Sequence, residues 1–371
     1  MQILINNPIQ ATWIFSLLFF IVLLVFVRPR KIMEWFPTSV TTELKGLAIL
    51  MIVLSHIGYF LATDTRFLWP LSIMAGVGVN LFLFLSGFGL TASQMQKNLS
   101  VTQFYKKRLL KLFSPFWLSL IIFLLLDFFI LKISYSWDYI GRAFIGIFTH
   151  ADVSQDINSP LWYFTFIFGY YLLFPLLFFK KKPWLTALFL YLVGYLVIYY
   201  KPAPLDYVLH LYKLHIFAFP LGVLAAWAVT KLKSPVILEK LAHGWRAIGY
   251  YLVIVGLLVL FLYANINSGI GESANKEQLM SILAVVAICL IFVLKKIEFR
   301  LFYWFGIYSY EIYLWHWPIM YRFDIFYLFV PAWLATLLYL GFFILLSWGA
   351  GRLTDLITRK KTRPVLLVPP K

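Results

Sequence analysis

Lys45 and His56 are ionisable residues that bracket an apolar run, and their spacing places them on one side of a helix. The sequence between them contains no other charged residue. At about 100° per residue, eleven steps bring a helix back to within roughly 20° of its starting direction, ~16 Å further along the axis. An ionisable group at membrane depth is costly and by default marks a functional site. The pair predicts a site that takes a charged molecule from one side of a membrane and reacts near the middle.

Each residue of the pair also has a structural interpretation. Lys45 at the edge of an apolar run is typical of a side chain that extends its charge to the membrane surface. A single histidine in a membrane helix is often hydrogen-bonded to a neighbouring helix. Their position on one helix face favours the functional interpretation.

The segment 76–89 combines small residues with hydrogen-bonding groups. Its four glycines allow neighbouring helices to approach closely. Asn80 and Ser86 add polar side chains to the same segment. We expect the helices that carry His56 and this segment to enclose a narrow pocket, although the glycines alone do not indicate chemistry.

Two further patterns predict ligand binding. Arg108 and Lys111 lie three residues apart, so they share a helical face and can grip phosphate groups, Arg in bidentate fashion and Lys as a point charge. The alternative is a basic cluster that only fixes membrane orientation. Trp162, in an aromatic segment at 162–164, is either part of an interfacial aromatic belt or a platform on which a sugar stacks.

The segment 306–318 carries a carboxylate, Glu311, and an imidazole, His316, in an otherwise apolar helix. Ser309, Tyr313 and His316 follow i, i+4, i+7 spacing and share a stripe. A purely structural network between helices is the alternative. Weaker candidates of the same kind are Asp127, His210 and His215.

These residues must be held by membrane-spanning helices. The chain of 371 residues is 62% hydrophobic and only 13% charged, which is not typical of a soluble domain. A span needs about 20 apolar residues. The sequence therefore predicts an all-α, polytopic membrane bundle of about 11 helices, at 11–27, 44–62, 71–92, 112–131, 161–179, 184–200, 207–230, 248–264, 279–294, 301–321 and 329–350.

The distribution of positive charge predicts the topology. With the N-terminus outside, 25 of the 32 Lys and Arg residues lie in cytoplasmic segments, which is the positive-inside pattern. The C-terminus is then cytoplasmic, and the net charge of +17 does not indicate nucleic-acid binding. No cleavable signal peptide is expected. Cys289 is the single cysteine, which excludes an internal disulfide and a cysteine-rich metal site, and no metal is expected.

Several blocks of the chain resemble the membrane-bound acyltransferase family 3, whose members O-acylate cell-surface carbohydrates. The resemblance extends over about residues 43–350. The similar blocks are Glu43 to His56, for the family's Arg-x10-His motif; 81–88, for its phenylalanine-rich block; 108–115, for its cytoplasmic Arg-x-x-Arg segment; and 161–163, Pro175 and 308–318, for its later blocks.

The chain also departs from the family pattern. Lys45 and Lys111 stand where the family has arginine, so the charge is kept while bidentate geometry is lost. The first span exceeds the ten-helix core that the resemblance implies, and the extracytoplasmic esterase-like domain of some members is absent. We expect an extra helix with a basic linker at 1–40, the acyltransferase-like domain at 41–355 and a basic cytoplasmic tail at 356–371.

The resemblance implies that the chain is an enzyme with no permanently bound cofactor. Its donor would be an acyl-CoA, most often acetyl-CoA, held by Lys45, Arg108 and Lys111 from the cytoplasmic side. His56 would act as general base or carry the acyl group transiently. Asn80 and Ser86 would orient His56 or the thioester carbonyl, and Glu311 and His316 would serve the acceptor.

The acceptor implied by the resemblance is a hydroxyl of a surface polysaccharide, a lipid-linked sugar or another envelope glycan, at the cell membrane. A transporter that exports a glycan or small anion is the alternative, since intramembrane histidines and glycine-broken helices also suit transport. The odd span count and the lack of matching halves argue against it. A structural scaffold is a third reading, but it does not need ionisable groups at depth.

Overall fold

The structure is a computed structural model that describes residues 3–30, 34–97, 99–232, 244, 246–268 and 273–357, and these residues form an almost entirely helical protein. The helices are α1 (Pro8–Val25), α2 (Thr38–Ser55), α3 (Ala75–Lys97), α4 (Val101–Leu126), α5 (Trp137–Phe144), α6 (Trp162–Leu173), α7 (Pro183–Tyr200), α8 (Leu209–His215), α9 (Ala218–Val229), α11 (Arg246–Ile266), α12 (Ala274–Leu294), α13 (Arg300–Ile307), α14 (Ser309–Pro318) and α15 (Ala332–Ile357). Two short strands, β1 (Val27–Pro29) and β2 (Ile297–Phe299), pair antiparallel. The expected cytoplasmic tail lies outside the described residues from residue 358 onward. So do three basic residues of the predicted cytoplasmic segments, Lys31, Lys233 and Lys240.

The chain is a multi-pass membrane protein. Within the described ranges, nine helical segments are long and apolar enough to cross a bilayer. They are 8–25, 38–61, 75–97, 101–131, 183–200, 203–229, 246–266, 274–294 and 332–356.

The other two expected spans are shorter or broken helices. The run at 161–179 gives α6, which ends at Leu173. Pro175 follows two residues later, and proline has no backbone N–H with which to continue a helix. The run at 301–321 is divided into α13 and α14, because the chain leaves helical geometry at Tyr308 (φ −103°, ψ 12°).

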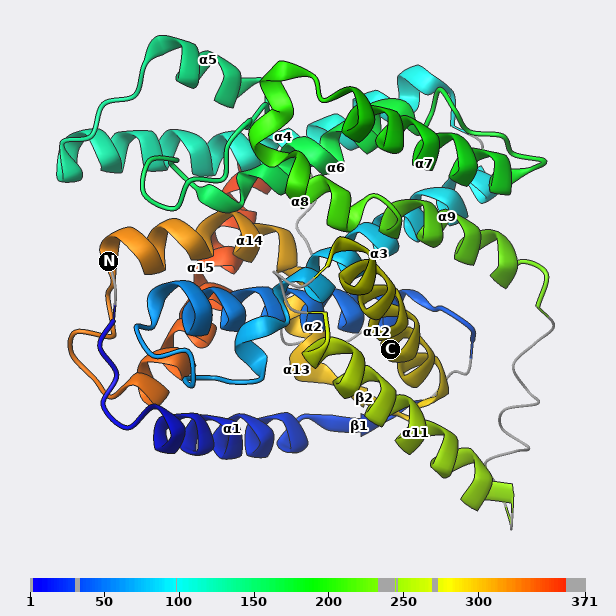
Figure 1. Cartoon of the computed structure of the whole chain (residues 1–371), viewed down its shortest axis with the longest axis horizontal. Coiled ribbons are helices and arrows are strands. Elements are labelled where there is room, and N and C mark those ends of the chain that lie inside the picture. The colour runs from blue at the N-terminus through cyan, green and yellow to red at the C-terminus, as the bar shows by residue number, and fades with distance from the viewer. Residues whose placement is uncertain are drawn as a thin grey trace.

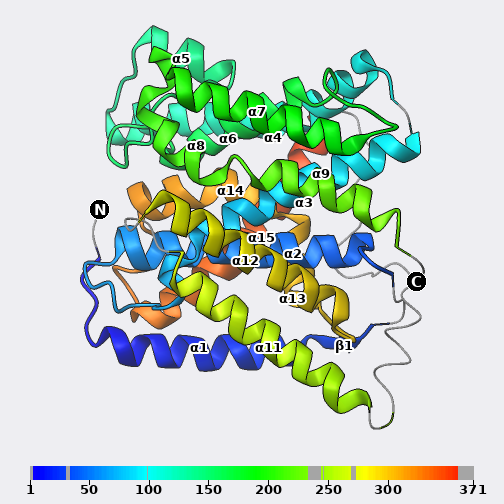
Figure 2. The same cartoon turned by 45° about the vertical axis from the view of Figure 1, so that its right-hand side comes forward.

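The helices are arranged in tiers around α2. Both cartoon views place α4, α6 and α7 together along one side of the molecule and α1 along the opposite side (Figures 1 and 2). Between them lie α2, α3, α12 and α14. In keeping with this central position, α2 with the turn that follows it is the most extensively buried candidate span.

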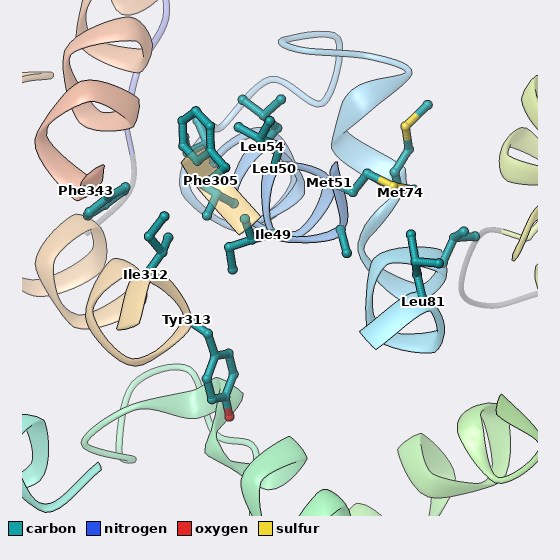
Figure 3. Close-up of a cluster of buried hydrophobic side chains, with 14 of the residues drawn as sticks. Ile49, Leu50, Met51, Leu54, Met74, Leu81, Phe305, Ile312, Tyr313 and Phe343 are labelled. Atoms are coloured by element: carbon teal, nitrogen blue, oxygen red, sulfur yellow. The ribbon is translucent and has the colours of Figure 1, made fainter. Parts of the chain in front are cut away.

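The core is built on the side chains of α2. Ile49, Leu50 and Leu54 from α2 meet Phe305 from α13 and Ile312 from α14 in the cluster shown in Figure 3. Two glycines allow α2 and α13 to touch through their backbones. A Cβ added at Gly46 would lie 1.7 Å from the Phe302 carbonyl oxygen, and one at Gly306 would lie 1.8 Å from the Thr42 carbonyl oxygen.

The glycine-rich helix α3 makes similar close approaches on two sides. A Cβ at Gly78 would lie 2.8 Å from the Ala48 carbonyl oxygen of α2, and one at Gly87 would lie 2.2 Å from the Phe219 carbonyl oxygen of α9. The expected close packing therefore holds at these two positions. At Gly76 and Gly89, by contrast, nothing lies within 4 Å of an added Cβ.

The N-terminal helix α1 is fastened at both ends. At one end β1 pairs with β2, which leads directly into α13. At the other end the Ile3 N–H donates to the Leu61 carbonyl oxygen (2.8 Å), and the Thr63 N–H donates to the Ile3 carbonyl oxygen (3.0 Å). Leu61 is the last residue of the turn that begins at His56, and Thr63 follows shortly after it, so the first span helps to fix the end of that turn.

Candidate active site

His56 begins a π-helical turn that continues α2 from Ser55 to Leu61. Such turns are rare and frequently occur at functional sites. The imidazole lies against that of His316 from α14, with the His56 Nδ1 atom 2.8 Å from the His316 Nε2 atom. The two rings are nearly parallel, with 10° between their planes. The structure thus brings together two predicted histidines that are 260 residues apart in the sequence.

The hydrogen bonds of His316 fix the direction of this pair. Its Nδ1 atom lies 3.0 Å from the Ile312 carbonyl oxygen and 2.9 Å from the Tyr313 carbonyl oxygen. Since both partners can only accept, Nδ1 carries the proton. In the neutral ring Nε2 is then an acceptor, and the Nδ1–H of His56 donates to it. This leaves the Nε2 lone pair of His56 available for chemistry.

Two aromatic rings hold the His56 imidazole edge-on. The ring centroid of Trp317 lies 4.9 Å from that of His56, and that of Phe60 lies 5.7 Å away. Trp317 is 2% exposed, and its indole N–H has no hydrogen-bond partner among the described residues. Trp317 was not predicted as a site residue, although it directly follows His316.

A cavity of about 250 Å³, here called the basic cavity, gathers most of the predicted binding residues. Its cationic side chains come from α2 and α4, and none of its described lining residues is acidic. The Arg108 Nε atom is buried without a hydrogen-bond partner among the described residues. Such a cluster favours an anionic ligand. The predicted residues in its lining are Lys45, Ser86, Arg108, Lys111, Ser309 and Tyr313.

Two tyrosines of this cavity were not predicted. The Tyr171 hydroxyl lies beside Ser86 and close to the Arg108 guanidinium. The Tyr310 hydroxyl donates to the Leu112 carbonyl oxygen (2.7 Å) and so ties α14 to α4. In the sequence both appeared as ordinary members of aromatic helices.

A second cavity of about 420 Å³, here called the aromatic cavity, lies on the other side of His56. Rings from several elements line it, together with a few polar groups, which is typical of a small-molecule site. Its lining includes His56, Phe60, His150, Asp152, Ser159, Trp162, Tyr207, His210 and Trp317. Trp162 and the weaker candidate His210 were predicted, whereas His150, Asp152 and Tyr207 were not.

A small cavity of about 30 Å³, here called the waist, has lining residues in common with both of the others. It shares Phe82, Tyr163 and Tyr313 with the basic cavity. With the aromatic cavity it shares His56, Pro160 and Trp162. Its remaining lining residues are Ile52 and Val79. His56 therefore stands where a molecule from the basic cavity would meet one from the aromatic cavity.

The loop that forms one wall of the aromatic cavity is tied to α14 and to the turn that follows it. The Asn158 side-chain amide donates to the Leu314 carbonyl oxygen (3.0 Å), and the Tyr313 hydroxyl donates to the Pro160 carbonyl oxygen (2.8 Å). In Figure 3 the Tyr313 side chain points away from the core cluster. Arg322 donates to the Asp156 carbonyl oxygen and pairs with the buried carboxylate of Asp127.

Two carboxyl groups of this loop differ in environment. The hydroxyl of Ser154 and the N–H groups of Gln155 and Ser154 donate to Asp152, and these hydrogen bonds lower the pKa of its carboxyl. Burial raises the pKa of the Asp156 carboxyl, whose Oδ2 atom accepts from the Asp152 N–H (2.7 Å). Asp152 is thus a charged acceptor at the edge of the aromatic cavity.

Among the predicted residues, His316, Asn80 and Glu311 lie outside the linings of the three cavities. The Asn80 side chain donates to Ser281 of α12 (2.5 Å), and its oxygen lies 2.8 Å from the His215 Nδ1 atom. The His215 ring stacks on Trp162, which lines the waist. This hydrogen-bond network therefore supports the wall of the waist. Glu311 is 2% exposed and lines none of the three cavities. In the described part of the chain, no three His, Cys, Asp or Glu residues are grouped to hold a metal ion.

Comparison with known proteins identifies one family. Residues 44–352 match acyltransferase family 3, which is described as an acyltransferase domain. The match begins within α2 and ends within α15, so it contains all three cavities and leaves out α1. Neither a curated protein nor a solved structure matches the chain.

Proposed function

The chain belongs to this acyltransferase family, and we propose that it moves an acetyl group from acetyl-CoA to a hydroxyl of an envelope carbohydrate. The observation that carries the proposal is the position of His56 at the junction of the basic and the aromatic cavity. A transferase needs two substrates to meet at one reactive group, and this arrangement provides one cavity for each.

The basic cavity suits the donor. Coenzyme A carries several phosphate groups, and Lys45, Arg108 and Lys111 line this cavity with no acidic neighbour among its described residues. The unpartnered Arg108 Nε atom gains a hydrogen bond when a phosphate binds. The pantetheine arm would then run past Phe82 and Tyr313, which belong to both the basic cavity and the waist, and bring the thioester to His56.

The histidine pair suits proton transfer from an alcohol. The Nε2 atom of His56 accepts the proton of the acceptor hydroxyl while the oxygen attacks the thioester carbonyl carbon. The carbon–sulfur bond then breaks, and the proton passes to the thiolate of coenzyme A. His316 accepts the Nδ1–H of His56 throughout, which holds the ring in place and stabilises the imidazolium that forms.

The aromatic cavity suits a carbohydrate acceptor. The rings of Trp162 and Tyr207 offer flat apolar faces for a sugar ring, and the Asp152 carboxylate accepts hydrogen bonds from its hydroxyls. In the topology predicted from the positive charges, this cavity opens outside the cell and the basic cavity opens to the cytoplasm. The enzyme would then act at the plasma membrane on a glycan that is already exported.

The test replaces His56 by alanine. We expect His56→Ala to lower transfer of radiolabelled acetyl from acetyl-CoA to envelope glycan by at least about 10²-fold, the usual minimum contribution of a general base. The measurement uses membranes that contain equal amounts of folded protein. Tyr59→Ala is the matched control, because Tyr59 lies on the same turn, is 49% exposed and lines none of the three cavities. Wild-type transfer rates in His56→Ala would contradict the assignment.

A further inference from the structure

We propose that the waist is the subsite for the acyl chain, and that Ile52, Val79 and Phe82 restrict the donor to a two-carbon acyl group. This inference deepens the proposed function and rests on it. Ile52 comes from α2, and Val79 and Phe82 come from α3. Together they form the apolar part of the waist lining, and His56, Trp162 and Tyr313 contribute polar groups to the same lining.

The reaction requires the acyl chain to lie in or beside the waist. The carbonyl carbon must stand next to the His56 Nε2 atom, because the hydroxyl that His56 deprotonates forms its new bond to that carbon. The bond that breaks joins the same carbon to sulfur, and the proton goes to the departing thiolate. The rest of the acyl group stays attached to this carbon, so it either fits the waist or extends into the space of the acceptor.

The waist holds little more than a methyl group beside the carbonyl. Its volume is about 30 Å³, and a single water-sized sphere needs roughly 10–15 Å³ on the same measure. Its wall is also tightly packed, since Ile52 is 4% exposed and Val79 is 9% exposed. Each further methylene must therefore displace neighbouring atoms.

The helices that carry the wall are packed closely together. A Cβ added at Gly78 would lie 3.0 Å from the Ile52 Cγ1 atom, which shows that α2 and α3 are in direct contact beside the waist. Close-packed interiors resist expansion. One methylene too many in such an apolar pocket reduces kcat/KM by about 10- to 200-fold.

The test compares acetyl-, propionyl- and butyryl-CoA as donors to the same glycan. Wild-type protein should prefer acetyl over butyryl by at least about tenfold in kcat/KM. Val79→Ala removes two methyl groups from the wall and should reduce this preference by about tenfold. Val77→Ala is the matched control: it is the same substitution on the same helix, at a buried residue (1% exposed) that lines none of the three cavities. Its preference should equal that of the wild type.

Three results would overturn the assignment. Equal use of acetyl- and butyryl-CoA by the wild type would do so, as would an unchanged preference in a folded and active Val79→Ala protein. If Val79→Ala does not fold, Ile52→Val removes one methylene from the same wall and must shift the preference in the same direction. Wild-type protein that transfers none of the three acyl groups would instead overturn the proposed function, and this assignment with it.

Discussion

At the scale of single residues, a chain of hydrogen bonds that ends at His56 sets the protonation of the site. The Ile312 and Tyr313 carbonyl oxygens set the tautomer of His316, and His316 in turn sets that of His56. A histidine is oriented here by a second histidine, in the place where a carboxylate orients it in serine proteases. A neutral partner avoids the cost of a buried negative charge in an apolar helix.

His316 is therefore a positioning residue, and its loss should affect the chemical step. In His316→Ala we expect kcat to fall by about 10²-fold, because His56 loses the acceptor that holds its Nδ1–H. The KM for acetyl-CoA should stay within about twofold, because His316 does not line the basic cavity. Steady-state kinetics at equal amounts of folded protein measures both. A raised KM with unchanged kcat would show that His316 has only a structural role.

Which residues belong to the site could be predicted from the sequence better than which of them are in contact. Lys45 and His56 share one helix, so helical geometry alone relates them. The contact between His56 and His316, in contrast, depends on how α2 packs against α14. Spacing along the chain cannot give that packing. The positions of His150 and Asp152 were missed because they lie in a loop without helical periodicity.

At the scale of elements, glycines decide how closely the helices around the site approach. α3 and α9 touch backbone to backbone, because a Cβ at Gly222 would lie 2.0 Å from the Phe84 carbonyl oxygen. Gly89 on the same helix α3 faces open space and lines the basic cavity. The glycines of α3 and α9 thus serve two purposes, close packing and room for a ligand.

The same substitution, glycine to alanine, at Gly222 and at Gly89 should distinguish the glycine needed for close packing from the glycine that leaves room for a ligand. Gly222→Ala places a methyl group against a backbone oxygen and should destabilise the folded protein by about 1–3 kcal/mol, the usual cost of overpacking. Gly89→Ala meets no atom within 4 Å and should leave the midpoint of thermal unfolding in detergent unchanged or slightly higher. Its added methyl group should instead weaken acetyl-CoA binding. Equal unfolding midpoints for the two variants would refute this division.

The elements themselves were largely predictable, since long apolar runs are a strong signal. Nine of the expected spans are helices long and apolar enough to cross a bilayer, counted over the described residues. The signal is weaker where a helix breaks inside an apolar run. The helix breaks at Tyr308 although the apolar run continues through this residue. The break separates α13, which packs on α2, from α14, which carries His316.

At the scale of the whole molecule, three cavities follow one another from the basic cavity through the waist to the aromatic cavity. This order gives the proposed reaction a direction, with the proposed anionic donor on one side and the proposed neutral acceptor on the other. The helix α1 lies outside the family match, yet hydrogen bonds from Ile3 and Thr63 join its leading segment to the end of the His56 turn and the residues after it. We infer that it steadies the turn rather than taking part in the reaction.

The most direct test of this account follows the label across a membrane. Purified protein in sealed vesicles receives acetyl-CoA, radiolabelled in the acetyl group, on the side to which the basic cavity opens, with carbohydrate acceptor enclosed on the other side. We expect labelled acceptor in the enclosed space, coenzyme A left on the donor side, and at least about a 10²-fold lower yield with His56→Ala. Passage of unlabelled acceptor across the membrane without acetyl transfer would contradict it and indicate a transporter.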